Sequence, residues 1–73
     1  MGEHLSHQCQ QVLNYIEQFG SITPLEAFED LGIYRLSARI KDLRDLGYPI
    51  VTTREHYFNN GIYKQYARYS IKK

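Results

Sequence analysis

The stretch that decides the fold is GIYRLSARIKDLRDLGYPI, residues 32–50. Its apolar residues recur every three or four positions, which is the spacing of the buried face of an amphipathic helix. These residues are Ile33, Leu36, Ile40 and Leu43. Four basic residues fall outside that apolar face: Arg35, Arg39, Lys41 and Arg44. The stretch therefore predicts a helix with one face in a core and a basic outer surface.

Glycine and proline set the end of this helix. Gly47 is the residue type that terminates helices in a left-handed conformation, and Pro49 lacks the amide hydrogen that a further turn needs. We expect the helix to begin after Ile33 and to end at Leu46.

A first helix is predicted from about Ser6 to Phe19, where Gly20 ends it. Its inward residues follow the helical spacing. They are expected to be Leu5, Cys9, Val12, Leu13, Ile16 and Phe19. Because Cys9 lies on this stripe, we expect it to act as a small buried hydrophobe.

A second helix begins at TPLE, residues 23–26. Thr23 is a good N-cap, Pro24 suits the first helical position, and Glu26 stands where the partner of a capping box belongs. We expect this helix to cover residues 24–31. Its predicted inward residues are Leu25, Phe28 and Leu31.

Beyond Gly47 the sequence takes on the β-branched and aromatic composition of strands. NNG, residues 59–61, is a turn signal that tolerates positive φ, so we expect a β-hairpin with arms near Ile50–Tyr57 and Ile62–Ile71. A two-stranded sheet needs large side chains to cover a helix bundle. The strand tyrosines expected to pack in this way are Tyr57, Tyr63 and Tyr66.

The order of these elements defines the fold class. Each of the three helices and the hairpin has one apolar face to bury. All of these faces are buried when the helices form a bundle and the sheet covers its open side. An extended link at residues 21–22 can add a short third strand. We therefore predict an α+β winged helix-turn-helix fold, with residues 1–73 as one domain and residues 1–5 frayed.

The segment GSITPLEAFEDLGIYRLSARIKDLRDLGYPIVT, residues 20–52, resembles the small winged helix-turn-helix proteins common in bacteriophages and prophages. The shared features are a G-x-I-T-P-x-E-A helix start, an L-G-x-x-R-L-x-x-R-I-x-D-L third helix, and a G-Y-x-I entry to the hairpin. The resemblance covers about residues 12–71, and the third-helix motif is its most specific part. It implies this fold and DNA binding, without a known target site.

Charge is divided unevenly along the chain. Residues 1–32 contain five acidic residues and no Lys or Arg, whereas residues 33–73 contain all nine basic residues and three acidic ones. The two segments therefore carry formal charges of −5 and +6, although the whole chain carries only +1. A basic half attracts polyanions even when the chain is nearly neutral. This division agrees with double-stranded DNA as the partner.

In helix-turn-helix proteins the second helix of the pair lies in the major groove, with its outward N-terminal residues near base edges. Here those residues are Tyr34, Arg35, Ser37, Ala38 and Lys41. Arg39 and Arg44 lie on the flanks, which suits contacts to phosphate. The hairpin offers a second anchor on the DNA backbone, with Arg54, His56, Asn59, Asn60 and Lys64.

Asp42 and Asp45 leave a second interpretation open. They repel phosphate unless they pair with Lys41 and Arg44 within the helix, as solvated ion pairs do on an ordinary helix surface. The acidic first half of the chain also suits a protein-interaction module, such as a phage-encoded inhibitor of a host nucleic-acid enzyme.

The sequence offers no catalytic pattern, since it has no glycine-rich phosphate loop and no Ser-His-Asp set. His4, His7 and Cys9 are too few for a metal site, and Cys9 fits the core instead. A single cysteine excludes an intrachain disulfide, and no apolar run reaches the roughly 18 residues of a membrane span. We expect no enzyme, cofactor, metal or membrane partner. We expect a cytoplasmic monomer or weak homodimer, in the host cell if the protein is phage-encoded.

Overall fold

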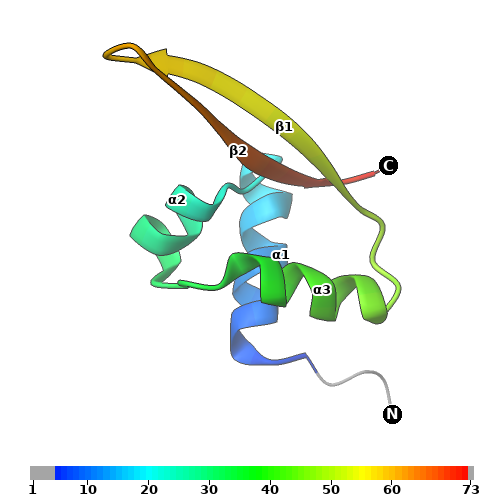
Figure 1. The fold of residues 1–73 in the computed structure, drawn as a ribbon. Helices are drawn as coiled ribbons and strands as arrows, with labels where there is room; N and C mark the ends of the chain where they lie inside the picture. Colours follow the sequence, from blue (N-terminus) through cyan, green and yellow to red (C-terminus); the bar gives the residue numbers. More distant parts are fainter. Residues whose placement is uncertain (1–4, 73) are drawn as a thin grey trace.

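Three helical segments precede a long hairpin in the computed structural model, which describes residues 5–72 (Figure 1). The elements are α1 (His7–Phe19), α2 (Pro24–Glu26), η1 (Ala27–Leu31), α3 (Leu36–Asp45), β1 (Ile50–Asn59) and β2 (Ile62–Ile71). α3 packs across α1, α2 lies to one side, and the hairpin lies over the helices with its turn standing clear of them. The order of elements is the predicted α+β order.

α1 has the predicted bounds. The Ser6 side chain accepts a hydrogen bond from the Cys9 amide, and Gly20 ends the helix in the left-handed region at φ 92°. The buried residues of α1 are Cys9, Val12, Leu13 and Ile16. Phe19 was predicted to face inward and is 63% exposed. It lies in the last turn, beyond the core residues of α1, and its ring packs on Tyr15 instead.

The second helix begins with the predicted capping box. Thr23 Oγ1 accepts from the Glu26 amide at 3.2 Å, and Glu26 Oε1 accepts from the Thr23 amide at 2.9 Å. After Glu26 the helix widens into the π turn of η1, which contains the fully buried Ala27. The prediction that Leu25 and Phe28 face inward is wrong, since they are 63% and 53% exposed. The residue that enters the core here is Ala27, and Leu25, two positions earlier, lies about 200° around the helix from it.

α3 begins later than predicted, at Leu36 rather than directly after Ile33. Gly32 takes φ 70° and the Ile33 amide donates to the Ala27 carbonyl, so these residues close the preceding helix. Tyr34 and Arg35 consequently lie in the turn before α3, with Arg35 at the N-cap. The predicted core positions Ile33, Leu36, Ile40 and Leu43 are all buried.

The hairpin pairs β1 with β2 from Ile50↔Ile71 to Asn59↔Ile62. Asn60 and Gly61 form its two-residue turn, with φ of 53° and 77°. Two positive φ values define a type I′ turn, whose twist matches that of the strands. β1 is two residues longer than the predicted arm. The predicted third strand is present as a single bridge, in which the Ile22 and Tyr69 backbones exchange two hydrogen bonds of 2.9 Å.

Only the base of the hairpin covers the core. Ile50 is buried there, and Tyr48, Tyr69 and Ile71 are partly buried against the same cluster. The distal strands continue past the helices. The prediction that Tyr57 and Tyr63 pack on the bundle is therefore wrong, since they are 45% and 50% exposed, whereas Tyr66 is half-buried as expected.

Candidate nucleic-acid interface

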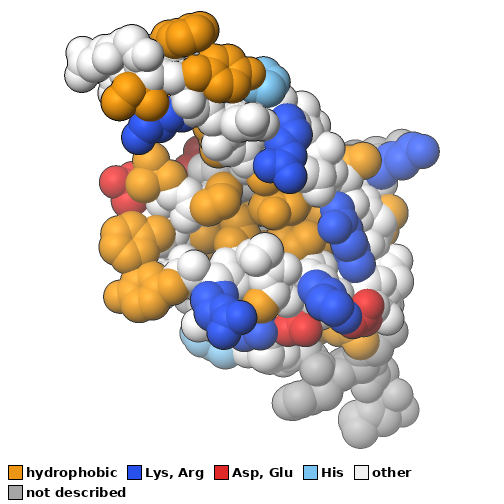
Figure 2. Space-filling view, viewed as in Figure 1, with side chains coloured by type: hydrophobic (Ala, Val, Ile, Leu, Met, Phe, Trp, Pro, Cys, Tyr) orange, Lys and Arg blue, Asp and Glu red, His pale blue; other side chains and the backbone are white. Residues whose placement is uncertain are grey.

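Basic side chains gather on the face that α3 and the hairpin share. Figure 2 shows Lys and Arg side chains in an arc over α3 and the hairpin, with hydrophobic side chains between them. The predicted site residues come from three parts of this surface: the turn before α3, α3 itself, and the hairpin.

The turn before α3 presents Tyr34 and Arg35 to solvent. Tyr34 is 81% exposed, and its ring lies 5.2 Å from that of Phe28. Arg35 makes no side-chain hydrogen bond to the helix end. Both residues line a shallow hollow of about 560 Å³ at the start of α3, together with Ala38 and Arg39. Ser37 is exposed in the first turn of α3. The structure thus brings together several of the residues predicted to approach bases.

Two ion pairs occupy the outer surface of α3. Lys41 Nζ lies 3.0 Å from Asp45 Oδ2, and this contact raises the pKa of Lys41. Arg39 lies 3.1 Å from Asp42 and also donates to the Gln8 side chain. Ion pairs within the helix are therefore present. Asp42 pairs with Arg39 rather than with Arg44, so the pairing with Arg44 that the sequence suggested is wrong.

Arg44 ties α3 to the hairpin. Its Nε and Nη2 donate to the Ile50 carbonyl at 3.1 and 2.9 Å, and Nη2 also donates to Thr52 Oγ1 at 2.8 Å. A guanidinium presents its donors in a fixed planar fork, which sets both direction and distance. Arg44 was predicted for phosphate contact. Its contacts show that it also orients the start of β1 against α3.

The strand register divides the predicted wing residues between two faces. Side chains alternate along a strand, so Arg54 and His56 share a face with Thr52, which contacts Arg44 of α3. Lys64 pairs with Tyr57 in the register and lies on the opposite face. Asn59 shares that opposite face, and Asn60 lies in the turn. Only Arg54 and His56 therefore extend the α3 surface directly.

The opposite face holds an ionic cluster that the sequence did not reveal. Arg68 donates to Glu55 and to Ser21, each at 2.9 Å, and lies 3.9 Å from Glu26. The Tyr66 hydroxyl and then the Arg68 guanidinium lower the pKa of Glu55. The signal for this cluster was the NNG turn, since the register it sets places Arg68 diagonally across from Glu55.

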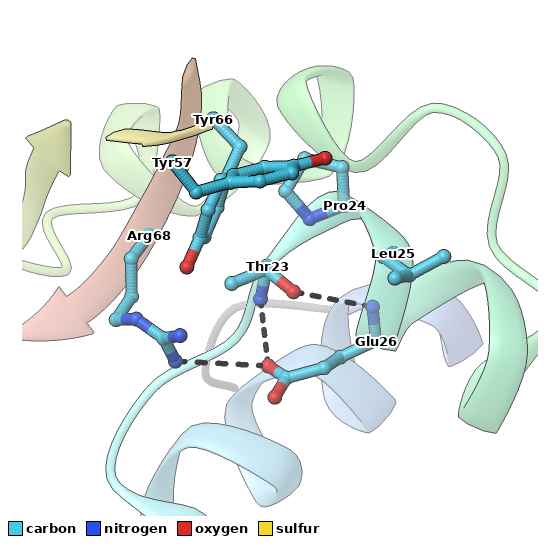
Figure 3. A pocket seen from close by; sticks show the side chains of 7 residues that line it. All are labelled: Thr23, Pro24, Leu25, Glu26, Tyr57, Tyr66 and Arg68. Atoms are coloured by element: carbon cyan, nitrogen blue, oxygen red, sulfur yellow. Dashed lines mark hydrogen bonds and ion pairs between the residues drawn. The ribbon is translucent and has the colours of Figure 1, made fainter. Parts of the chain in front are cut away.

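A hollow of about 540 Å³ lies beside this cluster, between α2 and the hairpin. Figure 3 shows Tyr57 and Tyr66 beside Pro24, with Arg68 reaching toward the Glu26 carboxylate. Leu25 completes the apolar lining. With the Glu26 and Glu55 carboxylates close by, this hollow is unsuited to phosphate.

Four basic residues make neither an ion pair nor a side-chain hydrogen bond within residues 5–72: Arg35, Arg54, Lys64 and Lys72. All four are exposed. Unpaired cations keep their full field for a polyanion, whereas paired ones lose part of it. Arg35 and Arg54 are the two that belong to the turn before α3 and to the hairpin face turned toward α3.

The chain belongs to the winged helix-turn-helix domain family, whose model matches residues 7–73. Together with the helices and hairpin described above, this match confirms the predicted winged helix-turn-helix fold and domain family. No curated protein and no solved structure matches the chain significantly.

No described helix is long and apolar enough to cross a membrane. Within the described part of the chain, no three His, Cys, Asp or Glu side chains gather where they can hold a metal ion. Cys9 is a free, buried thiol in the core, as predicted. His4, which the sequence groups with it, lies outside the described residues.

Proposed function

We propose that this protein binds double-stranded DNA, with α3 in the major groove and the hairpin as a wing on the neighbouring backbone. The observation that carries the proposal concerns two exposed cations, Arg35 and Arg54, which make no ion pair with any residue that the structure describes. They lie on elements that Arg44 holds together. Membership of the winged helix-turn-helix family supports it. The role that fits best is a phage-type transcriptional regulator or architectural factor in the cytoplasm.

The contacts divide between bases and phosphates. Tyr34, Arg35 and Ser37 are exposed around the start of α3, where side chains of such helices meet base edges. Arginine recognises guanine through two hydrogen bonds, so Arg35 is the main candidate for reading sequence. Ala38 and Lys41 are candidates for the same groove. The residues proposed for phosphate or backbone contact are Arg39, Arg44, Arg54, His56, Asn59, Asn60 and Lys64.

Titration of a labelled duplex at several salt concentrations tests this function. Since bound phosphates release counterions, we expect the logarithm of the binding constant to fall linearly with the logarithm of salt. Arg54→Ala is expected to weaken binding to every sequence and to reduce that slope by about one. Arg35→Ala is expected to reduce the preference for the best sequence instead. Glu17→Gln, on exposed α1 surface, is the control. Absence of binding at low salt overturns the proposal.

A protein-interaction role is the second candidate. It is favoured by two exposed apolar side chains, Leu25 and Phe28. Leu25 lines the hollow of Figure 3, and Phe28 is followed in the sequence by the acidic Glu29 and Asp30. A stoichiometric partner retained from nuclease-treated lysate and lost with Leu25→Ser supports this role. Retention by Leu25→Ser as strong as by the wild type contradicts it.

A further inference from the structure

Three aromatic rings form a continuous stack at the end of the hairpin. Phe58 is 74% exposed, and its ring meets that of Tyr63 edge-on at 5.3 Å between centroids. Tyr63 in turn stacks on His56 at 5.4 Å, and its hydroxyl is hydrogen-bonded to His56 Nδ1. Phe58 is therefore an exposed apolar ring in contact with Tyr63, and Tyr63 is in turn held by His56. It is not among the residues packed against the core.

The face that carries this stack has no acidic residue. The register places on it Thr52, Arg54, His56, Phe58, Tyr63, Gln65, Ala67 and Tyr69. Glu55 lies on the other face, in the cluster with Arg68. The same face includes Thr52, which contacts Arg44 of α3. A cation and an aromatic stack thus share the hairpin face that continues from α3.

We propose that Phe58 acts as a wedge that enters the base stack of bound DNA and bends the duplex. The inference rests on the proposed DNA-binding function. Apolar side chains inserted between base pairs unstack them and kink the duplex, and aromatic rings stack on any base. Arg54, on the same face, supplies the cation that holds the adjoining backbone. Tyr63 and His56 act as positioning residues, because they fix the ring that enters.

The length of the hairpin makes this geometry possible. Figure 1 shows the turn end standing clear of the helices, and Figure 2 shows hydrophobic side chains gathered there. A protein partner would also accept an exposed ring, but the unpaired Arg54 and the absence of acids on this face favour a polyanion. Pyrimidine–purine steps unstack most easily, so duplexes rich in TpA steps are the expected preference.

Energy transfer between dyes at the two ends of a duplex of about 30 base pairs reports bending wherever the protein sits. With the wild-type protein at saturation we expect a bend on the order of 20–90°. Phe58→Ala is expected to abolish most of that bend and to weaken binding at least about five-fold. Phe58→Leu, which keeps an apolar wedge, is expected to retain the bend. Tyr57→Ala is the matched control, since it removes a neighbouring exposed ring from the other face.

Each outcome decides the proposal. A bend lost in Phe58→Ala and kept in Tyr57→Ala and Phe58→Leu supports the wedge. A straight duplex under bound wild-type protein overturns the wedge and leaves DNA binding intact, as does a bend that Phe58→Ala retains. Equal loss in both alanine variants overturns it too. Absence of any duplex binding overturns both the wedge and the proposed function. Circular dichroism checks that each variant keeps the fold.

Discussion

At the scale of single residues, Arg44 shows why a basic side chain is hard to assign from sequence. Its position on the flank of α3 fitted a phosphate contact, yet its guanidinium donates to the Ile50 carbonyl and to Thr52. The partners are backbone and hydroxyl oxygens in β1, which helical spacing does not reveal. Thr23, Pro24 and Glu26 are the opposite case, because a capping box depends only on residues within one turn.

Arg44→Ala is expected to destabilise the fold by about 1–2 kcal/mol, because it removes the charged donor of hydrogen bonds to Ile50 and Thr52. Arg44→Lys is expected to recover only part of this, since an ammonium lacks the planar fork. Urea unfolding measures both. Arg54→Ala is the control, and its effect is expected to stay within about 0.5 kcal/mol. Equal destabilisation by Arg54→Ala and Arg44→Ala would contradict the assigned role of Arg44.

Tyr15 gives a pH dependence with a defined sign. Its hydroxyl donates to Asp30 at 2.6 Å, and this hydrogen bond, aided by burial and by Glu26, raises the pKa of Tyr15 from 10.0 to about 12. Because the pKa of Tyr15 is higher in the folded state, its hydrogen bond adds to the free energy of unfolding at a pH below the pKa of the unfolded state. This added stability is lost as the pH rises through the pKa of the folded state.

We therefore expect wild-type protein to unfold at higher urea concentration than Tyr15→Phe at neutral pH. The difference between them should shrink as the pH rises from 10 to 12. Comparison with Tyr15→Phe separates the effect of Tyr15 titration on stability from that of the six other tyrosines, which both proteins share. A difference that does not change over this range would show that the hydrogen bond to Asp30 contributes no stability.

At the scale of elements, boundaries with strong local signals were predictable and packing faces were less so. Gly20 and the NNG turn placed the end of α1 and the hairpin correctly. The predicted burial of Leu25 and Phe28 was wrong, because the small residue Ala27 between them is the one that enters the core. In the hairpin, the alternation of side chains places Phe58 on the same face as Arg54, a relation that depends on the register and not on the positions of basic residues.

An ion pair within α3 is expected to lower the affinity of the protein for DNA. Asp45 pairs with Lys41, and both side chains are largely exposed, so the Asp45 carboxylate weakens the attraction of Lys41 for phosphate. Asp45→Asn is expected to tighten duplex binding about two- to ten-fold at low salt and to steepen the salt dependence by about one. Fluorescence anisotropy at several salt concentrations measures both quantities.

Glu17→Gln removes the same charge from exposed α1 surface and serves as the control for net charge. Its effect is expected to be clearly smaller than that of Asp45→Asn. Equal gains from the two variants would mean that overall charge, rather than Lys41 on α3, governs affinity.

At the scale of the whole molecule, the division of charge along the sequence becomes a division between elements. The described acidic residues before Gly32 belong to α1, α2 and η1, whereas the described basic residues belong to α3, the turn before it, and the hairpin and its end. The two groups meet where Arg68 lies 3.9 Å from Glu26. The molecule extends 52 Å along its longest axis, which includes the projecting hairpin. The separation of acidic from basic residues and the fold were predictable, because they depend on composition and on the order of the elements. Which hairpin residues share the face of α3 could be decided only from the strand register.

Mapping amide chemical shifts during titration with a DNA duplex tests the central claim most directly. We expect the largest changes in the turn before α3, in the first turns of α3, and on the hairpin from Thr52 to Tyr63. The amide chemical shifts around Glu17 in α1 and around Glu29 and Asp30 in η1 should change little. Changes centred on Leu25, Phe28 and the hollow beside α2, with α3 unaffected, would contradict the proposed DNA interface.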